Sequence, residues 1–178
     1  MDITVRQLTI DLWPALEDLF GSKGACNGCW CMYWRIGSNY HKRSRDLNKR
    51  EFKSIVKKGP PPGLIAFLDS IPVGWCQLTA KSSLPWLEKN YGSDDNASDF
   101  WSISCFYVKN GYRKIGVTSA LIEYAIKLAK RSRIKLIEAY PGNSNSSFTG
   151  FPSTFRKAGF KVTDHGKYSR TIVRLYLR

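Results

Sequence analysis

The chain has 178 residues, of which 28 are Lys or Arg and 14 are Asp or Glu, and its formal net charge is +14. This is the length of one ordinary domain, and a hydrophobic share of 43% excludes an intrinsically disordered chain. The charge favours acidic partners such as a polyphosphate cofactor, a nucleic acid or an anionic surface.

The sequence shows no signal for export or for membrane insertion. No apolar run reaches the roughly 20 residues that span a bilayer, and residues 1–6 lack the basic-then-apolar layout of a signal peptide. The cysteines number five, and an odd number without an export signal indicates free thiols in a reducing compartment. We therefore expect a cytoplasmic protein that has no membrane partner.

The N-terminal third predicts a strand followed by two helices. Residues 3–10 alternate imperfectly between apolar and polar side chains, which is typical of a strand. Apolar residues recur at helical spacing over residues 13–20 and again over 47–58, and a glycine follows each helix. Residues 22–45 are rich in Cys, Trp and Tyr without a regular period, so we expect them to be irregular.

The middle of the chain predicts a β-hairpin and a long buried strand. Residues 64–68 and 73–79 are apolar runs, and residues 69–72 between them have the composition of a turn. Residues 81–100 are polar and predict a surface loop. Residues 101–108 are apolar and aromatic, and they predict a strand in the core.

The C-terminal part contains the clearest helix, because the apolar residues between 117 and 131 form one continuous stripe. A buried strand over 134–140, a short helix over 152–158 and a pair of strands at 160–162 and 171–177 follow. No repeat and no linker divides the chain, so residues 1–178 predict a single domain. Its fold class is α/β (mixed α+β), with helices flanking a mixed sheet.

A basic, glycine-containing turn joins the strand that ends at Val108 to the helix that begins at Val117. A strand–turn–helix unit points backbone N–H groups and the positive end of the helix dipole at one place. Gly116 lets the backbone approach a phosphate closely, and Arg113 and Lys114 add positive charge. The residues indicate an anion site, although a plain β–α connection with solvated Lys and Arg explains them equally well.

Two motifs in this region resemble those of one family. Val108 followed by Arg113-x-x-Gly116-x-Thr118 resembles the pyrophosphate signature of GNAT acetyltransferases, which is Arg or Gln, two residues, Gly, one residue, and Gly or Ala. The segment 155–160, Phe-Arg-Lys-Ala-Gly-Phe, resembles the Tyr-x-x-x-Gly-Phe motif of the same family. The predicted order of elements also matches that fold.

A further segment, Cys-Trp-Cys-Met-Tyr-Trp-Arg at 29–35, is similar to one found in a bacterial branch of the family. The chain also departs from the family pattern. Thr118 replaces the usual Gly or Ala, Phe155 replaces the tyrosine that protonates the leaving thiolate, and Ser102 stands near the position of a glutamate base. The two usual proton-transfer residues are therefore missing from their usual places.

The resemblance implies a GNAT-like fold and a binding site for acetyl-CoA. The central sheet would be mixed and mostly antiparallel, with six to seven strands, about four flanking helices and a splay between the fourth and fifth strands. The pantetheine arm would lie in the splay, where the Phe106 amide would face the thioester oxygen as an oxyanion donor. The residues implied to hold acetyl-CoA are Phe106, Tyr107, Val108, Arg113, Lys114, Ile115, Gly116, Val117, Thr118, Ser119, Asn143 and Asn145.

The acceptor amine must lose a proton during this reaction. Glu138, Tyr140 or Tyr107, acting through water, are the candidate proton acceptors, although a packing or solvated role explains each of them as well. No residue of the chain is an evident dedicated acid, so most of the acceleration would come from positioning.

The cysteine-rich segment allows more than one interpretation. Cys26, Cys29, Cys31 and His41 are zinc-ligand types, but Cys-x-Cys spacing is unusual for structural zinc, so we expect no metal. An apolar and aromatic lid over the amine pocket and a satellite core under a long loop explain the segment equally well. The residues expected on the acceptor side are Trp30, Tyr33, Trp34 and Arg35.

These features predict an N-acetyltransferase that moves an acetyl group from acetyl-CoA to a primary amine of a small molecule or peptide by direct attack in a ternary complex. The alternative is a CoA-binding or basic nucleic-acid-binding module without turnover. The basic residues are spread along the chain, so a nucleic acid is the less favoured partner. We expect a monomer or a homodimer.

Overall fold

The computed structural model describes residues 2–92, 100–142, 148–166 and 170–178. Within these ranges lie seven strands, six α-helices and three short 3-10 helices. Their bounds in chain order are β1 Ile3–Gln7, η1 Ile10–Leu12, α1 Trp13–Phe20, α2 Tyr33–Ile36, η2 Gly37–Lys42, α3 Arg45–Lys58, β2 Gly63–Leu68, β3 Ile71–Ala80, η3 Lys81–Ser83, α4 Pro85–Tyr91, β4 Phe100–Val108, α5 Val117–Arg131, β5 Leu136–Ala139, α6 Pro152–Lys157, β6 Lys161–Gly166 and β7 Arg170–Tyr176.

The strands form one sheet in the order β1-β2-β3-β4-β5-β7-β6. Every neighbouring pair is antiparallel except β4 and β5, which are parallel. The hairpin between β2 and β3 turns through Asp69 and Ser70, both at positive φ, as short hairpin turns require. The predicted mixed, mostly antiparallel sheet of six to seven strands is therefore confirmed, whereas the described helices number six rather than about four.

The splay predicted between the fourth and fifth strands begins after a short ladder. Pairing of β4 with β5 extends only from Phe100 to Ile103, although β4 continues to Val108. The register of β4 against β3 shifts after Ile103, where Ser104 is an extra residue without a partner of its own. Such a β-bulge bends a strand locally, and β4 has no ladder with β5 beyond it.

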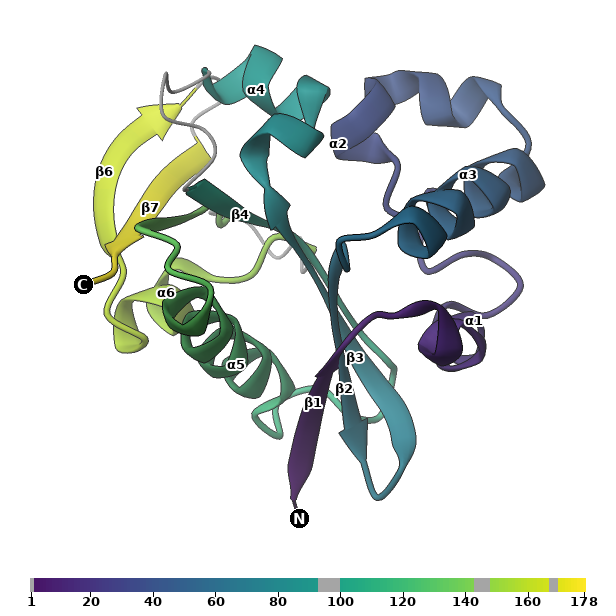
Figure 1. Cartoon of the computed structure of the whole chain (residues 1–178), viewed down its shortest axis with the longest axis horizontal. Helices are drawn as coiled ribbons and strands as arrows, with labels where there is room; N and C mark the ends of the chain where they lie inside the picture. The colour runs from purple at the N-terminus through teal and green to yellow at the C-terminus, as the bar shows by residue number, and fades with distance from the viewer. Residues whose placement is uncertain (1, 93–99, 143–147, 167–169) are drawn as a thin grey trace.

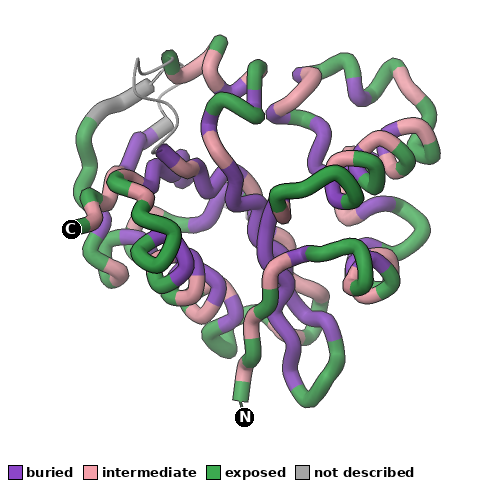
Figure 2. The backbone as a smooth tube through the Cα atoms, viewed as in Figure 1, coloured by how far each residue is buried: buried purple, intermediate pink, exposed green. Residues whose placement is uncertain are grey.

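Helices cover both faces of the sheet (Figure 1): α1 and α3 lie on one side, and α5 and α6 on the other. The stripe of α5 packs Val117, Leu121 and Ala125 into one core, while Trp13 and Phe52 belong to the core on the opposite face. Strands β2, β3, β4 and β5 are buried along most of their length (Figure 2), whereas β1 alternates between exposed and partly buried residues. Among the described residues, no helix is long and apolar enough to cross a membrane.

The surface loop predicted over 81–100 is wrong in its first half, which forms η3 and α4. Leu84 and Leu87 are fully buried there and pack with Trp34 and Tyr140 in a third core cluster. Ser and Asp are the commonest residues in the 81–100 window, so its polar composition did not reveal that Leu84 and Leu87 would be buried by residues distant in the sequence. Likewise, residues 22–45 contain α2 and η2.

Candidate active site

The first turn of α5 presents unpaired backbone amides. Gly116 is the N-cap at φ 95°, and no side chain caps the helix. The Ala120 amide donates to the Gly116 carbonyl at 3.0 Å, which leaves the amides of Val117, Thr118 and Ser119 without a carbonyl of their own helix to bind. The first turn holds no acidic residue, so this end of the helix is suited to an anion.

The turn before α5 is exposed and basic. Lys114 lies at φ 64° and Gly111 at φ 87°, and the side chains of Arg113 and Lys114 are exposed. In the described part of the chain, neither cation makes a hydrogen bond or an ion pair. A Cβ built on Gly116 would meet no atom within 4 Å, so an anion has room to approach the backbone.

The amide of Phe106 points away from β3 toward the splay. It donates a 2.6 Å hydrogen bond to the Phe148 carbonyl, while the Phe106 side chain is 1% exposed and packs in the core beside α5. The segment at 148–150 thus lies against β4 where β5 no longer pairs with it. Two predicted cofactor residues, Asn143 and Asn145, lie outside the described residues.

A cavity of about 290 Å³ lies on the α1 side of the sheet, against β3 and β4. Its lining includes seven aromatic residues, four cysteines and three polar residues. The aromatic residues are Phe20, Tyr33, Trp34, Tyr40, Trp75, Tyr107 and Phe148, the thiols are Cys26, Cys29, Cys31 and Cys105, and the polar residues are Gln77, Ser104 and Thr149. Tyr33 and Phe148, at 36% and 37% exposed, are the large apolar lining residues open to solvent.

The polar groups of the lining already bind one another or the nearby backbone. Gln77 Nε2 donates to the Cys31 carbonyl at 3.1 Å, and Ser104 Oγ donates to Gln77 Oε1 at 2.8 Å. Trp34 Nε1 donates to the Ser104 carbonyl at 2.9 Å, and Thr149 Oγ1 accepts from the backbone N–H of Gly142. Apart from the hydroxyls of Tyr33, Tyr40 and Tyr107, the cavity wall therefore has few hydrogen-bonding groups to offer a ligand.

Three thiols of the lining, those of Cys26, Cys29 and Cys31, have pKa values raised by burial. Burial raises the pKa of Cys29 to about 11, and it also raises the pKa of Cys26 and Cys31. Trp75 Nε1 donates to the Cys31 sulfur at 3.0 Å. A nucleophilic thiolate therefore has no support from these three residues.

The four predicted acceptor-side residues separate into two groups. Tyr33 and Trp34 line the cavity. Trp30 is 3% exposed and stacks on Trp13 in the core, and Arg35 Nη1 donates to the Ser83 carbonyl at 2.7 Å. Apart from Tyr107, sequence reasoning did not identify the β3 and β4 residues of the lining, although polar Gln77, Ser104 and Cys105 within apolar strands were a usable signal.

Glu138 and Tyr140 lie in a buried polar network away from the cavity lining. The Glu138 carboxylate, 0% exposed, pairs with Lys81 Nζ at 2.9 Å and with Arg174 Nε at 2.6 Å. Tyr140 donates to the same carboxylate at 2.5 Å and lies 3.1 Å from Ser102 Oγ. Burial and the Glu138 charge raise the pKa of the Tyr140 hydroxyl well above its usual range.

Phe155 is fully buried, and its ring lies 6.0 Å from that of Phe106 and 5.1 Å from that of Phe160. The position that resembles the family's tyrosine is thus part of the core beside the splay. His41 stacks on Tyr40, with 3.8 Å between ring centroids. In the ranges that the structure describes, no three His, Cys, Asp or Glu side chains form a group that holds a metal ion.

Comparison with known proteins gives a family match and many structural neighbours. A sequence model of the acetyltransferase (GNAT) family matches residues 28–151, whereas no curated protein matches the sequence. The PaiA N-acetyltransferase of Thermoplasma acidophilum in complex with coenzyme A has a TM-score of 0.59 at 21% identity, over 99% of this chain and 100% of that one.

Two further neighbours share the fold over nearly the whole chain. An N-acetyltransferase from Staphylococcus aureus Mu50 has a TM-score of 0.64 at 15% identity, with 100% of both chains covered. A phosphinothricin acetyltransferase from Sinorhizobium meliloti in complex with AcCoA has a TM-score of 0.61 at 16% identity, over 99% of this chain and 89% of that one. At these identities the similarity establishes a shared fold.

Proposed function

The chain belongs to the GNAT acetyltransferase family, and on this basis we propose that it transfers an acetyl group from acetyl-CoA to a primary amine, with the two substrates meeting at β4. One observation carries the proposal. Cys105 and Tyr107 line the cavity on the α1 side, whereas Phe106 between them packs on the α5 side and directs its amide to the splay. A donor in the splay and an amine in the cavity would therefore meet beside Phe106.

The described residues are suited to hold a CoA pyrophosphate at the start of α5. The amides of Val117, Thr118 and Ser119 would bind its oxygens, and the space beside Gly116 would admit them. The Arg113 side chain would add a charge-assisted hydrogen bond. Two neighbours of the same fold are complexes with coenzyme A or AcCoA, which supports the assignment of the donor.

The Phe106 amide would stabilise the charge that develops on the thioester oxygen during amine attack. The Phe148 carbonyl accepts from this amide in the structure, so the thioester oxygen would replace it as the acceptor when the donor binds. When bound, acetyl-CoA supplies the acetyl group and a thiolate leaving group. The amine nitrogen forms the new C–N bond, the C–S bond breaks toward sulfur, and the ammonium proton leaves to water.

Of the three candidate proton acceptors, Tyr107 alone lines the cavity among the described residues. Glu138 already pairs with two cations, and Tyr140 donates its proton to Glu138. We therefore assign the proton relay to water at the Tyr107 hydroxyl and a structural role to Glu138 and Tyr140. The buried network would hold η3, β5 and β7 together behind the splay.

The test of the proposal combines donor binding with turnover. A ligand at 100 times its Kd stabilises the native state by about 2.7 kcal/mol, which for a domain of this size raises Tm by roughly 5–10 °C. Acetyl-CoA and CoA should each produce such a shift, and thiol release should follow when amines are added. No Tm shift with either compound would refute the proposal. A Tm shift without thiol release for any amine would favour the alternative, a CoA-binding module without turnover.

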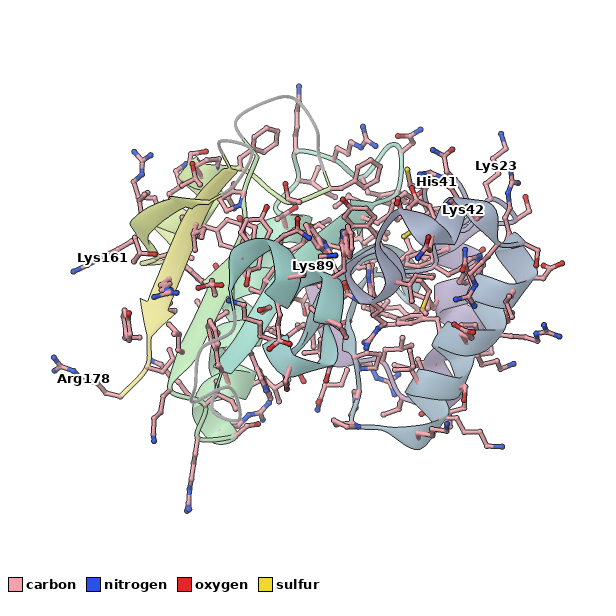
Figure 3. All side chains as sticks on the ribbon, turned by 90° about the horizontal axis from the view of Figure 1, so that it is seen from above. Lys23, His41, Lys42, Lys89, Lys161 and Arg178 are labelled. Carbon is pink, nitrogen blue, oxygen red and sulfur yellow. The ribbon has the colours of Figure 1, made fainter. Side chains whose placement is uncertain are left out.

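The nucleic-acid alternative predicts retention on DNA or RNA that weakens steeply with salt. Figure 3 shows labelled basic side chains directed outward from separate elements, with Lys161 and Arg178 at one end of the molecule and Lys23 and Lys42 at the other. This spread favours the enzyme, because a nucleic-acid site gathers its charges on one face.

A further inference from the structure

We infer that the acceptor is a monoamine with a small apolar or aromatic body and no second charge, rather than a polyamine, an aminoglycoside or a Lys-rich peptide. This inference rests on the proposed function, because it takes the cavity beside Phe106 as the place of the amine. It specifies the acceptor class from the chemistry of the cavity wall.

The first argument is the charge of the wall. Among the described residues that line the cavity there is no Asp, Glu, Lys, Arg or His. Burial raises the pKa of Cys26, Cys29 and Cys31 above the usual range, so these three thiols do not supply a charge. A second ammonium group on the acceptor would therefore lose water without gaining a carboxylate.

The second argument is the shortage of free hydrogen-bond acceptors. Gln77 Oε1 already accepts from Ser104, and the carbonyls of Cys31 and Ser104 accept from Gln77 and Trp34. Thr149 Oγ1 accepts from a backbone amide. Seven aromatic side chains make up most of the rest, and their only hydroxyls are those of Tyr33, Tyr40 and Tyr107, so the wall offers an apolar body more contact than it offers a polar one.

The third argument concerns size and long-range charge. About 290 Å³ is at the lower end of ligand sites, which suits an acceptor of one ring or one short alkyl chain. The net charge of +14 repels a polycation before contact, and Figure 3 shows Lys23 and Lys42 directed outward on the side formed by α1 and η2. A neutral wall also favours the free amine over the ammonium, and the free amine is the form that attacks the thioester.

The experiment uses two amines of equal length that differ in one end group. Hexylamine and 1,5-diaminopentane each have seven non-hydrogen atoms in line, but the first ends in a methyl group and the second in an ammonium group. With acetyl-CoA saturating, kcat/KM should be at least ~30-fold higher for hexylamine than for 1,5-diaminopentane. For 2-phenylethylamine, kcat/KM should be at least as high as for hexylamine. Equal or better turnover of 1,5-diaminopentane would overturn the inference while leaving the acetyltransferase intact.

A variant tests whether the wall sets this preference. Cys26→Asp places a carboxylate on the cavity lining and should reduce the hexylamine-to-diamine ratio at least ~5-fold. Asn27→Asp adds the same charge at the next residue, which is exposed and outside the lining, and should leave the ratio unchanged. An equal change in both variants, or none in Cys26→Asp, would show that the wall does not select the acceptor.

The acetyl-CoA thermal shift, measured for each protein, separates the two levels of the argument. A normal shift in both variants establishes that they fold and hold the donor, so a change in the ratio reports on the acceptor. A wild-type protein with neither a shift nor thiol release would overturn the proposed function together with this inference.

Discussion

Gly116→Asp tests the proposed pyrophosphate site most directly. Gly116 is exposed at the N-cap of α5, and a Cβ there meets nothing within 4 Å, so the carboxylate enters the space proposed for phosphate oxygens. Two like charges 4 Å apart repel by about 1 kcal/mol in water and about 4 kcal/mol at an effective dielectric of 20. For this exposed turn we expect about 2–3 kcal/mol, which weakens acetyl-CoA binding roughly 30- to 150-fold.

Two matched variants separate charge from shape and strain. Gly116→Asn has nearly the same volume without the charge and should lose much less affinity. Gly111 lies in the same turn, and its φ of 87° is close to the 95° of Gly116, with open space at both Cβ positions. Gly111→Asp should therefore carry similar backbone strain, about 1–2 kcal/mol. Calorimetry that finds wild-type affinity in Gly116→Asp, or the same loss in Gly111→Asp, would refute the placement of the site.

Three further variants test other parts of the argument. Arg113→Ala should weaken CoA binding by about 1–3 kcal/mol, whereas Arg131→Ala at the far end of α5 should not; equal losses in calorimetry would contradict the assignment. Glu138→Ala leaves Lys81 buried without its carboxylate and should lower the free energy of unfolding by about 3–5 kcal/mol. A decrease of less than about 1 kcal/mol in urea denaturation would show that the network is dispensable. Burial raises the pKa of Cys29 from 9.0 to about 11, so the neutral thiol favours the native state and the free energy of unfolding should fall by about 2 kcal/mol between pH 9 and 11 because of this group. Cys29→Ala should remove that share of the loss. A pH profile of stability that is the same in Cys29→Ala as in the wild type would contradict the reasoning.

The proposed cofactor side of the site could be located from the sequence because its signals are local. The turn before α5 carries Arg113, Lys114 and Gly116 within four residues, and the stripe of α5 specifies where the helix begins. Strand, turn and helix then follow one another in the chain and in space. The splay was implied by the resemblance, and the structure relates it to the bulge at Ser104.

The acceptor side was not predictable because its residues meet only through tertiary packing. Cys29 and Cys105 line the same cavity although 75 positions separate them in the sequence. The partner of Glu138 was missed for a related reason, since Lys81 lies in a window whose composition predicted a loop. Of the four residues named for the acceptor side, Tyr33 and Trp34 line the cavity. The segment at 30–35 was expected to be irregular, so the sequence offered no period that shows which of its side chains face the cavity.

The bulge at Ser104 explains how one strand would serve the two substrates proposed for it. In a regular strand, neighbouring side chains point to opposite faces, yet Ser104 and Cys105 both line the cavity. The extra residue changes the alternation, so that Tyr107 also faces the cavity while Phe106 packs on the α5 side. A strand without the bulge would shift by one residue and exchange these faces, which would place the Phe106 ring in the cavity. The ladder with β5 also ends at Ile103, directly before the bulge, and the Phe106 amide beyond it is directed to the splay. The irregularity of β4 therefore lies beside the cavity wall, the splay proposed for the donor and the amide between them.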